Sequence, residues 1–174
     1  MVAAALGASD CEASRNGWLA QPVAATTSLG FVLAAAMAAR SDGGRSRRAI
    51  PRTVYEALLG SVGVGSWWYH GPQGRGAALA HDATIGALVA YATAVPLVRW
   101  VGRRPALTNT AARRRAVSAG SLMGVAGLTY IFGRTTSPVC RPGSAWQLHG
   151  AWHLLSAAAF ALWGRALWPA AEPE

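Results

Sequence analysis

The 174-residue chain has few charged residues and no lysine. Only 13% of its residues are charged, whereas 52% are hydrophobic and the mean hydropathy is +0.24. One soluble domain of this length could not bury so much apolar surface, which argues against a soluble globular protein. The composition instead predicts an integral membrane protein.

Acidic residues are also scarce, and all sixteen basic residues are arginine, which gives a net charge of +9. A charge of this size could indicate nucleic-acid binding. The arginines, however, lie between apolar segments rather than along one helix, so we expect no nucleic-acid partner and interpret them as signals of membrane topology.

Five apolar stretches approach or exceed the roughly 18 to 20 residues that a helix needs to cross a bilayer core. They span residues 22–39, 50–70, 76–98, 116–133 and 146–168. No internal repeat or second domain is evident, so residues 1–174 are expected to form one all-α domain, a polytopic transmembrane helix bundle of about five helices. Residues 1–6 are too short to span a bilayer and have no basic region, so we do not interpret them as a cleaved signal.

Arginine is concentrated in two loops, residues 40–52 and 99–115, with five and six arginines respectively. Loops rich in arginine lie on the cytoplasmic side of a membrane. The N-terminus is therefore predicted to lie outside and the C-terminus in the cytoplasm, and the expected location is a bacterial cell membrane.

The four histidines fall at one depth in this topology. His70 ends the second predicted span, His81 begins the third, and His149 and His153 begin the last, so all four are expected near the outer face. His149 and His153 are four residues apart and share one helix face, a spacing that metallohydrolases use to bind zinc. The alternative is one histidine at the membrane interface and one that packs between helices.

Three histidines and a water molecule complete the coordination of a catalytic zinc, which lowers the pKa of that water towards ~7. The His149–His153 segment has no glutamate between its histidines, so a base must come from another helix, and Asp82 is the candidate. Ser66 shares a helix face with His70 and could hydrogen-bond a developing oxyanion. The alternatives are an ion pair of Asp82 with His81 or an arginine, and a Ser66 hydroxyl bonded to its own helix.

Several short motifs occur in an order that resembles the alkaline ceramidase family, and they extend over nearly the whole chain. They are Asp10-Cys11-Glu12, Thr27-Ser28, Gly65 to His70, Asp82, and Gln147 to Leu155. This family belongs to a superfamily of membrane proteins that includes the adiponectin-receptor and haemolysin III proteins and the Per1 lipid remodellers.

The resemblance implies a zinc-dependent amidase that cleaves the N-acyl bond of a ceramide-like lipid. His70, His149 and His153 would be the zinc ligands, Asp82 would handle the catalytic water, and Ser66 would support the metal site or the oxyanion. His81 has no counterpart in the family, and we interpret it as a residue beside the metal ligands or at the membrane interface.

The chain departs from the family in length and near its N-terminus. The family has seven helices, so this chain resembles a shortened version that has lost two of them after the third, and its substrate could differ from ceramide. Asp10, Glu12 and Asn16 match acidic and amide residues that bind calcium in some members, but their spacing is altered and calcium is not expected.

Cys11 and Cys140 both fall on the predicted outer side, where an oxidising compartment permits a disulfide. The resemblance implies that the two are bridged, which would tie the N-terminal segment to the start of the last helix. Two unpaired thiols are the alternative.

Two other functions are compatible with the same residues. An esterase or phospholipid-remodelling hydrolase would need the same polarised carbonyl and activated water as an amidase. A noncatalytic, receptor-like membrane protein could hold a structural zinc, closed by Asp82 as a fourth protein ligand. The sequence does not specify an oligomeric state or an acyl-chain length.

Overall fold

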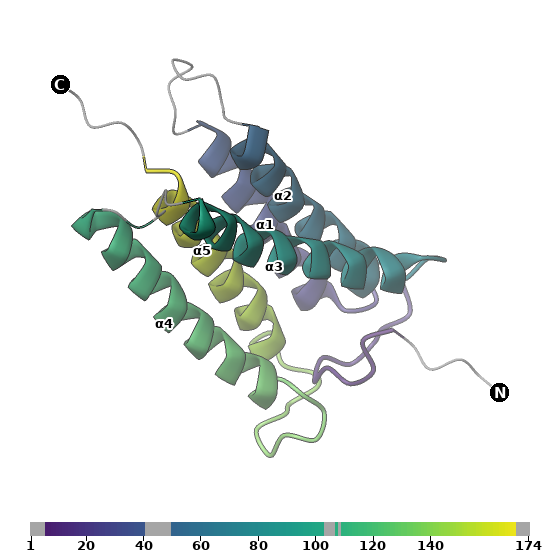
Figure 1. Cartoon of the computed structure of the whole chain (residues 1–174). Coiled ribbons are helices and arrows are strands. Elements are labelled where there is room, and N and C mark those ends of the chain that lie inside the picture. The colour runs from purple at the N-terminus through teal and green to yellow at the C-terminus, as the bar shows by residue number, and fades with distance from the viewer. Residues whose placement is uncertain (1–5, 41–49, 103–106, 108, 170–174) are drawn as a thin grey trace.

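The computed structural model describes residues 6–40, 50–102, 107 and 109–169. Within these residues the protein is all-helical and contains no β-strand (Figure 1). The five helices are α1 (Pro22–Arg40), α2 (Ile50–His70), α3 (Ala77–Val101), α4 (Thr110–Phe132) and α5 (Leu148–Leu167). Each corresponds to one of the five predicted apolar stretches, so the all-α fold is confirmed.

The largest difference lies at the start of α4, which begins at Thr110 rather than at the predicted residue 116. The side chain of Asn109 accepts a hydrogen bond of 2.7 Å from the backbone nitrogen of Ala112 and caps the helix. An asparagine cap satisfies a backbone donor that would otherwise be unpaired, so the helix extends through three arginines that the apolar pattern excludes.

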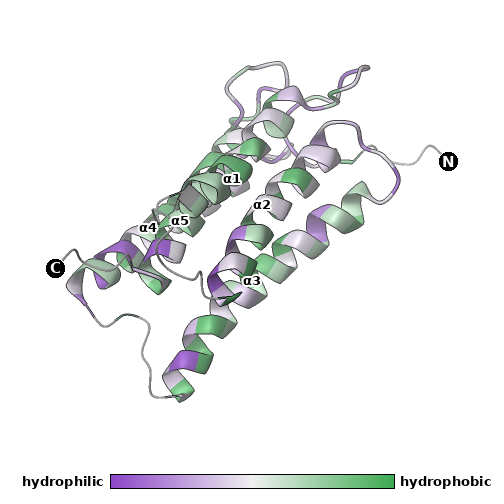
Figure 2. Cartoon of the chain, turned by 90° about the horizontal axis from the view of Figure 1, so that it is seen from above, coloured by the Kyte–Doolittle hydropathy of each residue, from purple (hydrophilic) through white to green (hydrophobic). Residues whose placement is uncertain are grey.

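Among the described residues, two helices are long and apolar enough to cross a membrane, judged by length and composition. They are α1, through its segment Pro22–Ala39, and α3, of which only 11% of the most apolar window is buried inside the protein. Apolar residues occur along most helices, and hydrophilic residues are concentrated near helix ends and loops (Figure 2).

The helices pack in a chain of neighbours, with α1 against α2 and α5, α3 chiefly against α2, and α4 chiefly against α5. The core contains Phe31, Tyr55, Leu59 and Leu88, from three of these helices. At the contact between α1 and α2, a Cβ on Gly63 would lie 2.9 Å from the backbone nitrogen of Val32 in α1. Only glycine allows the two backbones to approach this closely.

The N-terminal segment is tied to the loop between α4 and α5. A disulfide joins Cys11 to Cys140, which confirms the predicted bridge. The backbone nitrogen of Cys11 also donates to the carbonyl oxygen of Gly133 at 2.8 Å, and Arg134 contacts the carboxylate of Asp10 at 3.0 Å. These bonds hold the segment at the end of the bundle where α2 ends and α5 begins.

Candidate metal centre

Three of the four histidines converge, as the topology predicts. His70 is the last residue of α2, and His149 and His153 lie in the first two turns of α5. One ring nitrogen from each lies within 4.8 Å of the others, and the three residues are 1–5% exposed. The predicted histidine cluster is therefore present, and it is close enough to bind one metal ion.

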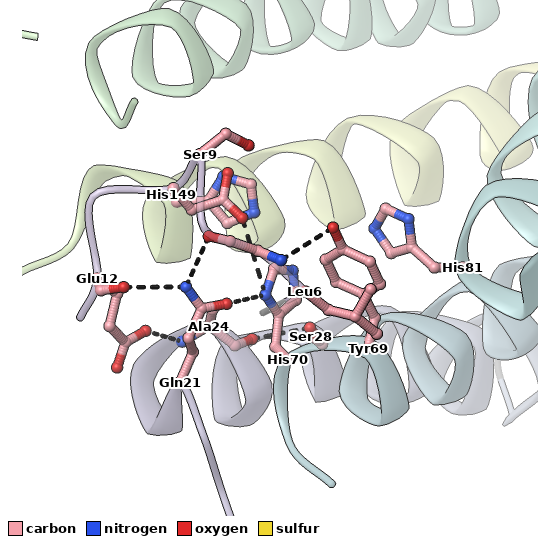
Figure 3. Close-up of polar contacts among 12 residues, drawn as sticks. Leu6, Ser9, Glu12, Gln21, Ala24, Ser28, Tyr69, His70, His81 and His149 are labelled. Carbon is pink, nitrogen blue, oxygen red and sulfur yellow. Dashed lines mark hydrogen bonds and ion pairs between the residues drawn. The ribbon is translucent and has the colours of Figure 1, made fainter. Parts of the chain in front are cut away.

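Hydrogen bonds fix the orientation of two of these rings, and Figure 3 shows the one made by His70. The Nδ1 of His70 lies 2.7 Å from the side-chain oxygen of Gln21, and the Nδ1 of His153 lies 3.1 Å from the carbonyl oxygen of Ala24. Carbonyl oxygens only accept, so each Nδ1 carries the hydrogen and each Nε2 retains a free lone pair. This is the tautomer that a metal requires, with the second nitrogen held by a carbonyl.

Gln21 is itself held in place from both sides. Its amide nitrogen donates to the carbonyl oxygens of Gly7 at 3.0 Å and Glu12 at 2.9 Å, which directs the amide oxygen towards His70. Gly7 has a φ of 72°, and a Cβ at this position would collide with the Gln21 side chain. A glycine is therefore needed where the N-terminal segment passes over Gln21.

Several ring nitrogens of the cluster are buried without a hydrogen-bond partner. Among the residues that the structure describes, these are the Nε2 of His70 and both nitrogens of His149. An unpaired buried polar atom costs free energy, and such atoms call for a specific explanation in a native fold. A metal ion bound to the Nε2 atoms would satisfy two of these three nitrogens, so the residues present fit the group that the sequence predicts.

A buried carboxylate lies beside the cluster. The Oδ1 atom of Asp10 is 3.4 Å from the Nδ1 of His149, and its Oδ2 atom is 4.0 Å from the Nδ1 of His70. Burial raises the pKa of the Asp10 carboxyl to about 6, against the opposing effect of the Arg134 guanidinium. At 3.4 Å the contact with His149 is not a hydrogen bond, but the ionised carboxylate of Asp10 is placed to accept the Nδ1 hydrogen after a small shift, which would leave Nε2 of His149 free for a metal.

The second acidic residue of the N-terminal segment has a different role. The two carboxylate oxygens of Glu12 accept hydrogen bonds of 2.8 Å from the backbone nitrogens of Val23 and Ala24, at the start of α1. A carboxylate at a helix N-terminus satisfies free backbone donors and interacts favourably with the helix dipole. Glu12 thus stabilises the helix that carries the partners of His153.

A cavity of about 290 Å³ opens beside the histidines. His149 and His153 contribute to its lining, and most of the remaining wall is apolar, from side chains such as Phe31, Leu88 and Phe160. A second cavity of about 320 Å³, between α3, α4 and α5, shares lining residues with the first, including Phe160. An apolar cavity with a few polar groups is the usual form of a small-molecule site.

The structure places Ser66 at this cavity. Its side chain is 1% exposed, lies one helical turn before His70 and contributes to the cavity lining. Among the described residues the Ser66 hydroxyl makes no hydrogen bond, including none back to its own helix. The hydroxyl is therefore free to bond a ligand in the cavity.

Asp82 is not brought to the cluster. Its side chain is 77% exposed and does not line the cavity, and its Oδ1 atom contacts the Nδ1 of His81 at 2.8 Å. Of the two ion pairs considered as alternatives, with His81 or with an arginine, the one with His81 forms. The role of Asp82 as the base that activates the catalytic water stays a prediction. His81 does line the cavity, with a side chain that is 18% exposed.

Sequence reasoning missed two residues of the site. Gln21 was not among the predicted site residues, although an amide directly before a helix-starting proline in an apolar region is a detectable signal. Asp10 belongs to a motif of the family resemblance and matches a calcium-binding position, but neither indicates its contact with His149, which depends on the fold of the N-terminal segment. No protein-family model, curated protein or solved structure matches the chain, so its function is inferred from the geometry of the site.

Proposed function

We propose that the protein is a zinc-dependent membrane hydrolase that cleaves the N-acyl amide bond of ceramide-like lipids. The observation that carries this proposal is the group of three buried histidines, with free Nε2 atoms, beside an apolar cavity. The proposal keeps the likeness to the alkaline ceramidase family, in a form with five helices instead of seven.

The donor set favours a catalytic zinc over a structural one. His70, His149 and His153 would hold the ion, and within the described residues no fourth ligand joins this group. Structural zinc sites have four protein ligands, whereas catalytic sites have three and keep one position open. When bound, zinc would polarise the scissile carbonyl and make water a better nucleophile at neutral pH.

The cavity supports a lipid substrate. Its wall is mostly apolar, which suits an acyl chain, and the second cavity extends the apolar surface along α3, α4 and α5. The free hydroxyl of Ser66 would donate to the carbonyl oxygen of the scissile amide as negative charge develops there. An ester would fit the same groups, so the choice between amide and ester requires an assay.

Exposed apolar surface supports a membrane location for more than the two most hydrophobic helices. Large hydrophobic side chains that are more than half exposed on α3 and α4 include Leu79, Leu97, Val98, Val117, Leu128 and Ile131. A soluble monomer rarely exposes so many. We propose five membrane crossings in a bacterial cell membrane, with the N-terminus and the metal centre at the outer side and the C-terminus in the cytoplasm.

The topology rests in part on arginines that the structure does not describe. Residues 41–49 and 103–106, which contain five of them, lie outside the described residues. A cysteine at either segment, labelled with a membrane-impermeant thiol reagent in intact cells, would test the orientation. Labelling from outside would contradict the proposed topology.

The function is tested by metal content and lipid cleavage of the protein purified in detergent. We expect close to one zinc per chain in the wild type and a large loss in the double variant His149→Ala, His153→Ala. His81→Ala removes an imidazole outside the ligand group and serves as the control that keeps its zinc. Equal zinc in the wild type and the double variant would remove the proposed site.

Substrate class is tested with matched N-acyl and O-acyl lipids. We expect release of fatty acid from the N-acyl lipid by zinc-loaded wild type and none by the double variant. Preferential cleavage of the O-acyl lipid would identify an esterase. A zinc-loaded protein that cleaves neither would support the noncatalytic alternative.

A further inference from the structure

The fourth histidine lies at the same cavity as the metal centre but outside the ligand group. His81, on the second turn of α3, lines the cavity together with Ser66, His149 and His153. Its ring centroid is 5.9 Å from that of His70. An imidazole in this position can reach a substrate in the cavity without binding the metal.

Two contacts hold the His81 ring in one orientation. It stacks on Tyr69, with ring centroids 4.4 Å apart and an interplanar angle of 24°, and Tyr69 in turn accepts a hydrogen bond of 3.0 Å from the backbone nitrogen of Gly7. The Asp82 carboxylate lies 2.8 Å from Nδ1 of the ring. Figure 3 shows the ring next to Tyr69, which in this view lies between His81 and the rings of His70 and His149.

The contact with Asp82 also selects the tautomer. An ionised carboxylate only accepts hydrogen bonds, so Nδ1 of His81 carries the hydrogen and Nε2 has a free lone pair. Within the described part of the chain, Nε2 of His81 has no hydrogen-bond partner. A histidine that lines the cavity, with its Nδ1 held by a carboxylate and a free lone pair on Nε2, has the arrangement in which histidine acts as a general base.

We propose that His81 is the proton-transfer residue of the hydrolysis and that Asp82 acts through it, as a positioning residue. This inference rests on the proposed function. It assigns the base to the neighbour of the residue that the family resemblance indicates, because the carboxylate of Asp82 is mostly exposed and the ring of His81 lies at the cavity.

The proposed steps balance without a further reactant. As the oxygen of water forms a bond to the amide carbonyl carbon, Nε2 of His81 accepts one proton from that water. His81 then donates this proton to the amide nitrogen as the carbon–nitrogen bond breaks. The products are a fatty acid and an amine, and His81 returns to its neutral form.

The test compares His81→Ala and Asp82→Asn with the wild type, all loaded with zinc. For His81→Ala we expect unchanged zinc content, KM within about twofold and a kcat lower by about 10²- to 10⁴-fold. Added imidazole should restore part of the lost kcat. Asp82→Asn should lower kcat less than His81→Ala. The asparagine amide can either accept from Nδ1 of His81 or donate to it, so only part of the molecules would hold the wrong tautomer. Thr84→Ala, one turn further along α3 with a hydroxyl bonded to Ala80, is the control and should keep full activity.

A second readout does not depend on activity. Nitrogen-15 NMR of histidine in the wild type should show His81 with its hydrogen on Nδ1, and this signal should change in Asp82→Asn but not in Thr84→Ala. A hydrogen on Nε2 in the wild type would overturn the assignment.

The outcomes separate this inference from the proposed function. A wild type that cleaves the lipid while zinc-loaded His81→Ala retains kcat within threefold would overturn the role of His81 alone. The same holds if Asp82→Asn is inactive while His81→Ala is active, because Asp82 would then act directly. A zinc-loaded wild type that cleaves no lipid would overturn both.

Discussion

Replacing Asp10 by asparagine separates metal binding from folding more cleanly than any change of a ligand. The carboxylate of Asp10 lies 3.4 Å from the Nδ1 of His149 and is 4% exposed. Removal of an outer carboxylate that holds a ligating histidine costs 10- to 100-fold in metal affinity in known sites. We therefore expect Asp10→Asn to weaken zinc binding by about 10- to 100-fold, or about 1.4–2.7 kcal/mol.

The same change should cost little in the stability of the metal-free protein. Burial raises the pKa of the Asp10 carboxyl to about 6, so the metal-free fold disfavours its charge rather than stabilising it. Arg134 loses its partner, but its side chain is 32% exposed and can be hydrated. The thermal midpoint of the metal-free variant should therefore equal or exceed that of the wild type.

The assay is competition with a chromophoric zinc chelator in detergent, beside thermal unfolding of the metal-free protein. Glu12→Gln is the matched control, because Glu12 is also a buried carboxylate but bonds the start of α1. It should reduce the free energy of unfolding by about 1 kcal/mol, the contribution of a helix cap, and so lower the thermal midpoint. Its effect on zinc affinity should be much smaller. Wild-type zinc affinity in Asp10→Asn would refute the assigned contact with His149.

Three further changes test the packing and the metal. Gly63→Ala should destabilise the protein by about 1–3 kcal/mol in unfolding assays, because the added Cβ meets the α1 backbone. The control Gly124→Ala, where the added Cβ has open space, should be neutral or stabilising. Equal effects of the two changes would contradict the close packing of α1 and α2. Replacing Cys11 and Cys140 by serine should cost about 2–5 kcal/mol and reduce zinc retention, and unchanged retention would show that the N-terminal segment holds its place without the bridge. A chelator should lower the thermal midpoint of the wild type but not of the double histidine variant, and an equal decrease would indicate a metal bound elsewhere.

The helices and the histidine cluster could be predicted from the sequence, because both depend on local periodicity and on the alternating direction of successive helices. His149 and His153 share a face through helical spacing alone, and His70 reaches them because the end of α2 and the start of α5 lie at the same end of the bundle. The disulfide was predicted from the family resemblance and is confirmed. The number of membrane crossings does not follow in the same way, since within the described residues only α1 and α3 are long and apolar enough to cross a membrane.

The surroundings of the cluster could not be predicted, because they depend on tertiary contacts. The partners of the histidines, Gln21 and Asp10, reach the site only through the path of the N-terminal segment over α1 and α2. The choice between His81 and Asp82 depends on how α3 is rotated against α2. Adjacent helical residues point about 100° apart, so a sequence places both at the right depth without saying which one faces the cavity.

The three cluster histidines and the groups that orient them come from two distant parts of the chain, with residues 7–28 and His70 in its first half and α5 near its end. A chain whose synthesis stopped before residue 140 would therefore contain only one of the three cluster histidines, and its Cys11 would have no partner for the disulfide. Under the proposed zinc site, retention of the metal would therefore distinguish complete and correctly oxidised chains from truncated ones.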